Sequence, residues 1–269
     1  MQVYNKLLET YGHQGWWPII NNKTLICEYG MGAPRNEAEA LEICIGAILT
    51  QGTQWYPNVV RAIQQLKLGR KFAKKELEVI RQAEILKGHI RERPRKQTTN
   101  HILTQNTNWN NVEKCIYNLN KNKLIDIDRL KEIKTGKLAQ LIKSSGYYNQ
   151  KAVKIKNFIG FITENKIDAL KKLSTDKLRE NLLSVNGIGK ETADSIILYA
   201  FEKPIFVIDA YTKRIFSKLG MCNEDIDYDE LQRMFTDNLN KDVELFKEYH
   251  ALIVRLGKEK TLNTISPRN

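Results

Sequence analysis

Apolar residues recur at helical spacing along most of the chain. The one run with strand character is PIFVID, residues 204–209, and no second run is an obvious partner for it. The pattern therefore predicts an all-α fold with about a dozen helices. The runs that carry the helical spacing are 36–51, 110–122, 137–145, 151–165, 174–185, 191–201, 211–220, 227–240 and 245–257.

Several of these runs begin or end at residues typical of helix termini. The segment Ser-Thr-Asp at 174–176 is expected to cap the helix that follows it, and the acidic stretch 225–229 offers caps for a later helix. Gly146 and Gly220 suit the left-handed turn that closes a helix. These positions predict helix boundaries and carry no chemistry of their own.

A short repeat interrupts the helical pattern. The segment AILTQGTQWYPNVVRAIQQLK at 47–67 is echoed by HILTQNTNWNNVEKCIYNLNK at 101–121. Two copies are too few for a solenoid, which needs several stacked units. A local duplication or a helical insertion over about 52–105 is the simpler interpretation, and deleting 52–105 is expected to leave a foldable chain.

Charge narrows the class of partner. The 269 residues are 42% hydrophobic and carry a formal net charge of +12, which is typical of a globular protein that binds a polyanion such as nucleic acid. An acidic membrane surface is the alternative partner. Residues 66–96, inside the repeat, hold eleven Lys and Arg against four Glu, although a basic run of this kind is more often a solvated helix face.

Cysteine spacing and hydropathy exclude other classes. The four cysteines lie far apart without a CxxC pair, which argues against a zinc site or a disulfide framework. The N-terminal residues lack the apolar core of a signal peptide, and no apolar run approaches the roughly 20 residues of a membrane span. We therefore expect a cytoplasmic protein with reduced thiols at residues 27, 44, 115 and 222.

The segment VNGIGK places two glycines between two helical runs. Gly187 and Gly189 would expose backbone N–H groups at the start of the second helix, where unsatisfied donors and the helix dipole favour an anion. Lys190 adds positive charge beside them. The segment is thus a candidate phosphate grip, and a plain helix turn with glycine caps is the alternative.

The context of this segment resembles a known family. The ordered pattern L-x-x-V-x-G-I-G-K-x-T-A-D-x-I, followed by PIFVIDAYTKRIFSKLG, is similar to the helix-hairpin-helix and aspartate of the endonuclease III superfamily of DNA glycosylases. ALEICIGAILTQ, LAQLIKSSGYYNQKAVKI and EYHALIVRLGK resemble other segments of that family in the same order. The likeness is nearest the iron–sulfur-free branch, which includes 3-methyladenine glycosylases and archaeal uracil glycosylases.

The resemblance implies an architecture and a partner. It implies a six-helix barrel domain over 36–202 that contains the hairpin and the insertion, and a terminal helical domain made of 1–35 and 203–269. It also implies a monomer that binds double-stranded DNA containing a damaged base and acts in base excision repair.

The resemblance assigns roles to the hairpin and to one aspartate. The hairpin would grip the DNA backbone, while Asp209 would stabilise the oxocarbenium-like sugar and orient water. Asp209 can also cap the helix after it, which is compatible with that role. The hairpin positions carried over as DNA contacts are Gly187, Ile188, Gly189, Lys190 and Thr192.

One departure from the family pattern predicts the reaction subclass. Bifunctional members place a Schiff-base lysine two residues beyond the second hairpin glycine, and Glu191 occupies that position here. Lys190 is one residue away, but a helix turns side chains by about 100° per residue, which aims Lys190 at phosphate instead. We therefore expect a monofunctional enzyme in which Glu191 and Asp209 are the catalytic carboxylates. The alternatives are a bifunctional glycosylase and lyase, or a non-catalytic DNA-binding protein.

Aromatic residues near the N-terminus are candidates for a base pocket. Trp16 and Trp17 lie where the iron–sulfur-free branch has pocket aromatics, and indole faces stack well on flipped bases, above all on cationic ones. Adjacent tryptophans are otherwise often core residues. We expect one of the pair to serve each purpose.

The two ILTQ copies offer alternative residues for filling the space that the flipped base leaves in the DNA. Gln51 and Gln105 compete for that role, and Trp55 and Trp109 compete for the adjoining pocket wall. The second copy is slightly favoured because its spacing to the later motifs is ordinary. Lys151, in the segment GYYNQKA, is a further candidate DNA contact.

No cofactor is expected. Members with a [4Fe–4S] cluster hold it with four cysteines after the helix that resembles EYHALIVRLGK, and residues 258–269 contain none. A monovalent cation at the hairpin carbonyls is implied by the family alone. The lysine that the alkyl-purine branch places in the late helix is Leu252 here, so uracil or a mismatched base is slightly favoured over an alkylated purine.

Overall fold

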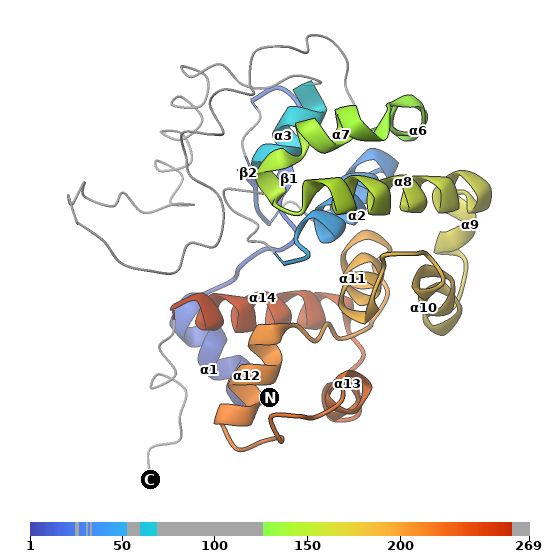
Figure 1. Cartoon of the computed structure of the whole chain (residues 1–269). Helices are drawn as coiled ribbons and strands as arrows, with labels where there is room; N and C mark the ends of the chain where they lie inside the picture. The colour runs from blue at the N-terminus through green and yellow to red at the C-terminus, as the bar shows by residue number, and fades with distance from the viewer. Residues whose placement is uncertain (25–26, 31, 33, 53–59, 69–125, 260–269) are drawn as a thin grey trace, which may run out of the picture. The chain divides into compact units, whose positions relative to one another are not determined.

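The computed structural model describes residues 1–24, 27–30, 32, 34–52, 60–68 and 126–259 (Figure 1). Two short strands, β1 (Ile19–Ile20) and β2 (Cys27–Glu28), pair with each other. A 3₁₀ turn, η2 (Lys143–Ser145), and a π-helical turn, η3 (Ile196–Ala200), join the α-helices. The helices are α1 (Gln2–Tyr11), α2 (Glu37–Leu49), α3 (Val60–Leu68), α6 (Ile127–Glu132), α7 (Thr135–Leu141), α8 (Tyr148–Asn165), α9 (Ile167–Lys171), α10 (Thr175–Leu183), α11 (Lys190–Ser195), α12 (Ala210–Lys218), α13 (Tyr228–Thr236) and α14 (Val243–Glu259).

The all-α prediction is confirmed apart from the short pair β1 and β2, but the strand character expected of 204–209 is not. The run 204–209 is buried but is not a strand, because its backbone groups bond to side chains instead of to a neighbouring strand. A proline at its first position is also unfavourable inside a sheet. The helix predicted at 110–122 lies outside the described residues.

The predicted N-terminal helix caps are confirmed, whereas Gly146 follows the 3₁₀ turn η2 and does not close an α-helix. Ser174 precedes α10 and its hydroxyl accepts a hydrogen bond from the backbone N–H of Lys177 at 3.2 Å. Asp227 caps α13 by accepting from the backbone N–H of Asp229 at 2.8 Å. Such caps satisfy the unpaired donors of a first helical turn and contribute about 1 kcal/mol each.

The chain divides into two compact units. The first comprises 1–19, 29–51 and 154–269, and the second comprises 20–28 and 52–153. The boundary between them falls within α8. The barrel domain predicted over 36–202 and the terminal domain predicted from 1–35 and 203–269 stay predictions.

The first unit is built around α2, which is apolar on nearly every face. Ile43, Ile45 and Leu49 are 0% exposed, and the helix packs against η3. Each such side chain contributes about 1.5–3 kcal/mol through burial, and a helix that is apolar all round belongs in a core. In Figure 1, α14 lies beside α1 and α12, and these helices pack in the same unit.

The second unit contains α3, which falls inside the predicted insertion 52–105. Ala62, Ile63 and Leu66 are 0% exposed, and α3 packs against α7 and η2. The beginning of the predicted insertion is therefore part of a packed core. No helix in the described part of the chain is long and apolar enough to span a membrane.

Candidate active site and hairpin

The hairpin joins α10 to α11 and needs glycine at one of its two positions. Gly187 has φ of +95°, and a Cβ there would lie 2.4 Å from Cγ of Lys154. Gly189 precedes α11 with φ of −94°, and a Cβ there would meet nothing within 4 Å. Glycine is thus required at 187 by both backbone conformation and close packing. At 189 a Cβ would have room.

The side chains of Gln51 and Lys154 support the hairpin through a chain of hydrogen bonds. The Gln51 amide Nε2 donates to the carbonyl oxygen of Gly187 at 3.0 Å and to Oγ1 of Thr192 at 2.8 Å. Lys154 Nζ donates to Gln51 Oε1 at 2.6 Å. Thr192 and Ile188 are 6% and 5% exposed. The side chains of Thr192 and Ile188 therefore support the hairpin from its buried side.

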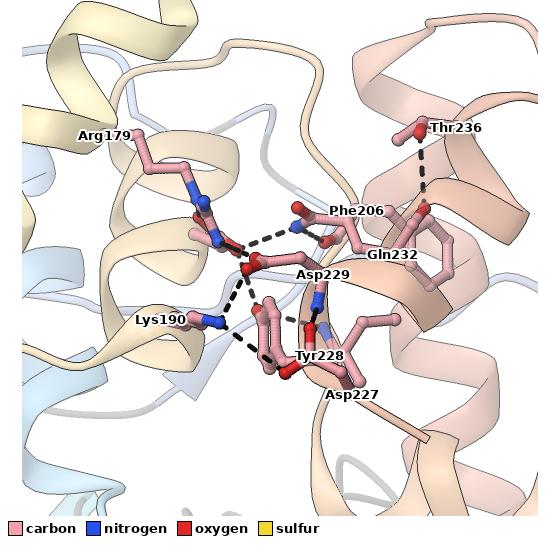
Figure 2. A network of polar contacts seen from close by, with 10 residues as sticks. Arg179, Lys190, Phe206, Asp227, Tyr228, Asp229, Gln232 and Thr236 are labelled. Carbon is pink, nitrogen blue, oxygen red and sulfur yellow. Dashed lines mark hydrogen bonds and ion pairs between the residues drawn. The ribbon is translucent and has the colours of Figure 1, made fainter.

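Lys190, expected to face phosphate, has a carboxylate partner. Its Nζ lies 2.6 Å from Oδ2 of Asp229 and 3.9 Å from Oδ2 of Asp227 (Figure 2). The hydrogen bond with Asp229 is the main cause that raises the pKa of Lys190. The lysine is therefore charged, and its charge is already balanced in this structure.

Asp209 lies at the start of α12. Its Oδ1 accepts hydrogen bonds from the backbone N–H and from the hydroxyl of Thr212, both at 2.7 Å. Oδ2 has no hydrogen-bond partner among the described residues. The residue thus caps its helix, as predicted, and keeps one half-buried carboxylate oxygen for other contacts.

Two buried aromatic residues lie within electrostatic reach of Asp209. Tyr199 Oη and His250 Nδ1 are 2.7 Å apart, and both side chains are buried. Burial lowers the pKa of His250, while the charge of Asp209 opposes that shift. His250 is therefore neutral, and its Nε2 is buried without a hydrogen-bond partner among the described residues.

Glu191 shows the most informative titration behaviour in this region. The side chain of Glu191 is exposed, and nearby protein atoms partly desolvate its carboxyl group. Burial, and next the charge of Asp209, raise the pKa of Glu191 from its ordinary value of 4.5 to about 7. The two predicted catalytic carboxylates are thus within electrostatic reach of each other, and the pKa of Glu191 lies near neutral pH.

The two N-terminal tryptophans differ in their surroundings. Trp17 is 5% exposed and packs edge-on against Tyr199, with ring centroids 5.2 Å apart. Trp16 is half-buried, and the Nζ of Lys258 lies 5.6 Å from its ring centroid. Trp17 is therefore a core residue, whereas Trp16 presents its face to a cation within reach of Asp209.

Lys151, the further candidate DNA contact, is buried. Lys151 is 1% exposed and donates from Nζ to the carbonyl oxygen of Ser145 at 2.6 Å. A buried ammonium cannot also contact a DNA backbone, so in this arrangement Lys151 supports its own glycine turn. Gln105, Trp55 and Trp109 lie outside the described residues.

The described residues do not include a metal site. Within them, no group of three or more His, Cys, Asp or Glu side chains could hold a metal ion. The donor set of a [4Fe–4S] cluster does not fit this sequence either, because its four cysteines are dispersed along the chain.

A family comparison identifies this arrangement. The sequence model described as "HhH-GPD superfamily base excision DNA repair protein" matches residues 99–241, more than half of the chain. The chain belongs to the HhH-GPD superfamily. The match contains the hairpin, Glu191 and Asp209, and it begins just before the second ILTQ copy. As a member of this superfamily, the protein is a DNA glycosylase of base excision repair.

Curated relatives agree with the HhH-GPD assignment. A Methanocaldococcus jannaschii protein, named as a candidate DNA repair glycosylase, is 52% identical over 162 residues, which cover 59% of this chain and 74% of the relative. Endonuclease III of Sulfolobus acidocaldarius is 31% identical over 126 residues, which cover 47% of this chain and 55% of the relative.

Solved HhH-GPD structures share the fold. The H. pylori 3-methyladenine DNA glycosylase bound to 1,N6-ethenoadenine has a TM-score of 0.56 at 24% identity, covering 97% of this chain and 99% of that chain. A trapped endonuclease III–DNA covalent intermediate has a TM-score of 0.52 at 16% identity, covering 96% and 84%. At these identities the likeness concerns the fold alone.

Three neighbours of Asp209 were not predicted as site residues. In the sequence, Tyr199 is one of several apolar residues of a helical run. His250 and Lys258 lie in α14 without a motif of their own. The only available signal was the likeness of EYHALIVRLGK to a family segment. Their proximity to Asp209 depends on packing across long sequence separations.

Proposed function

We propose that this HhH-GPD protein is a monofunctional DNA glycosylase, which hydrolyses the N-glycosidic bond of a flipped base and leaves the strand uncut. The observation that carries the proposal is Glu191, at the hairpin position of the Schiff-base lysine, beside Asp209. A carboxylate cannot form an imine. The neighbouring amine, Lys190, is held as an ammonium by Asp229.

The two carboxylates divide the hydrolysis between them. Loss of the base leaves positive charge on the sugar, and the Asp209 carboxylate, with its free Oδ2, stabilises that charge electrostatically. A general base is most effective when its pKa lies near the working pH. Glu191, with a pKa of about 7, is suited to take a proton from the attacking water.

Lys258 supports a neutral base as the substrate. Its ammonium occupies a face of Trp16 and lies within electrostatic reach of Asp209. A cationic alkylated purine would compete for that aromatic face and be repelled by the like charge. A neutral base such as uracil leaves as an anion, which an ammonium stabilises. We therefore place uracil or another deaminated or mismatched base ahead of alkylated purines.

Further features complete the proposal. The enzyme acts on double-stranded DNA as a cytoplasmic monomer without an iron–sulfur cluster, and a monovalent cation at the hairpin is compatible with this account. The net charge of +12 and the hairpin support the choice of DNA as partner.

The proposal is tested with a panel of duplexes. They carry uracil, thymine opposite guanine, 8-oxoguanine or an alkylated purine, and products are separated with and without alkali. We expect excision of uracil or mismatched thymine, with strand breaks only after alkali. Breaks without alkali would indicate a bifunctional enzyme, and no excision by folded protein that still binds DNA would indicate a non-catalytic binding protein.

A further inference from the structure

Helix α13 holds the loop that leads to Asp209. The backbone N–H of Ile208 donates to Tyr228 Oη at 3.3 Å, and Gln232 Nε2 donates to the carbonyl oxygen of Phe206 at 2.6 Å. The Phe206 ring also stacks on Phe235 of α13, with centroids 3.9 Å apart. No described strand pairs with this loop, so these bonds satisfy polar groups of a buried backbone.

The same two side chains, of Tyr228 and Gln232, bind Asp194 in α11. Tyr228 Oη donates to Oδ2 of Asp194 at 2.8 Å, and Gln232 Nε2 donates to the same oxygen at 2.8 Å. Asp194 is 0% exposed. Tyr228 and Gln232 therefore connect α11, the helix that follows the hairpin, to the loop that leads to Asp209.

The charge of Asp194 fixes the direction of these hydrogen bonds. Arg179 donates to Asp194 from Nε at 2.7 Å and from Nη2 at 3.2 Å. Burial raises the pKa of Asp194, but Arg179, Tyr228 and Gln232 oppose that shift, and four hydrogen bonds to the carboxyl group favour the charged form. A carboxylate only accepts. Tyr228 must therefore donate to Asp194, which leaves a lone pair for the N–H of Ile208.

Both proposed catalytic carboxylates lie on the segments that this network joins. Glu191 precedes Asp194 by three residues in α11, and Asp209 directly follows Ile208. Like charges at Glu191 and Asp209 repel each other, so their spacing needs an external constraint. The network of Asp194, Tyr228 and Gln232 supplies that constraint.

We propose that Tyr228 and Gln232 are positioning residues that set the distance between Glu191 and Asp209 through Asp194. This inference rests on the proposed function of the two carboxylates. Neither side chain has to touch the substrate, because each contacts residues that lie one to three positions from a carboxylate along the chain.

The test compares Tyr228→Phe with Thr236→Ala. The first removes the bonds to Asp194 and Ile208 and keeps the ring. The second is a matched control in the same helix, where the Thr236 hydroxyl donates, within the described part of the chain, only to the carbonyl oxygens of Gln232 and Arg233. The readouts are the single-turnover excision rate, the DNA dissociation constant, and the pKa of Glu191 from carboxyl NMR titration.

For Tyr228→Phe we expect the excision rate to fall about tenfold or more at an unchanged dissociation constant, because small misplacements of reacting groups have large effects on rate. The pKa of Glu191 should move towards 4.5, because the two carboxylates separate. Thr236→Ala should match the wild type in all three readouts. A folded Tyr228→Phe protein with the wild-type rate and the wild-type Glu191 pKa would overturn the proposal.

Gln232→Met provides a second variant with similar volume, and it should show the same pattern because it releases the carbonyl oxygen of Phe206. Unfolding of both variants would assign the network to stability alone and count against positioning. If the wild type excises no base, the proposed function fails, and the NMR titration still decides whether the network sets the spacing of the carboxylates.

Discussion

Glu191 and Asp209 form an interacting pair of carboxylates between the hairpin helix and the start of α12. Burial and then the charge of Asp209 raise the pKa of Glu191 to about 7, while Asp209 retains the role of helix cap. The pair thus contains one group, Glu191, that exchanges its proton near neutral pH. That combination suits hydrolysis of a glycosidic bond, in which one group stabilises positive charge and the other activates water.

Substitution of Asp209 separates its charge from its capping role. Asparagine caps helices about as well as aspartate, so Asp209→Asn should keep the bonds to Thr212 and the melting temperature. Loss of the negative charge should lower the single-turnover excision rate by roughly a thousandfold. DNA affinity, measured by fluorescence anisotropy, should stay within about twofold of the wild type. A variant with near wild-type excision would remove Asp209 from the mechanism.

The pH dependence of the excision rate is expected to follow the ionisation of the Glu191 carboxyl group. If its carboxylate accepts a proton from water, the single-turnover rate should rise with pH and level off above about 7. Glu191→Gln should abolish that inflection and lower the plateau by about a hundredfold. An unchanged inflection in Glu191→Gln would show that another group titrates.

The raised pKa also affects stability with a definite sign. Because the folded protein holds the Glu191 proton more tightly than the unfolded chain does, the stabilising contribution is complete below about pH 4.5 and is lost as pH rises through about 7. Urea unfolding across that window should show a steeper decline for the wild type than for Glu191→Gln. Equal slopes would contradict the raised pKa.

Lys258 is expected to control the choice between neutral and cationic bases. Lys258→Met removes the ammonium from the face of Trp16. Excision of uracil should fall about tenfold and excision of a cationic alkylated purine should rise, because a like charge is removed. Arg255→Met is a matched control, since it removes one positive charge from the same helix at a residue paired with Glu259. Parallel changes on both substrates would contradict a role in specificity.

Deletions distinguish the two repeat copies. The first copy supplies α3, whose apolar residues are buried, and Gln51, which contacts the hairpin. Deleting 69–121 keeps that copy, so this protein should unfold cooperatively and retain excision. Deleting 52–105 joins the ILTQ segment of the first copy to the rest of the second copy. The residues of the second copy must then replace α3. Equal melting temperatures for the two deletions would show that the copies are interchangeable.

The sequence predicted the helices and the hairpin because they depend on local patterns. Helical spacing, the cap at Ser174 and the glycine at 187 are each determined by a few neighbouring residues. Helices α1, α6 and α9 were not predicted, and the five or six residues of α6 and α9 carry too little periodicity. The run 204–209 resembled a strand because burial alone produces an apolar run.

The site was only partly predictable for a related reason. Asp209 and Glu191 follow from the ordered motif, but their neighbours His250 and Lys258 come from a helix far along the chain. The pairing of Lys190 with Asp229 likewise joins residues of different helices. No local pattern encodes such contacts. The sequence therefore predicted phosphate binding for Lys190 but not its pairing with Asp229.

The most direct test of a monofunctional mechanism is borohydride trapping on a duplex that the enzyme excises. The wild-type protein should give no covalent adduct, because Glu191 cannot form an imine and Lys190 is paired with Asp229. Glu191→Lys, which restores an amine at the hairpin position, serves as the positive control and should give one. An efficient adduct with the wild-type protein would contradict the account.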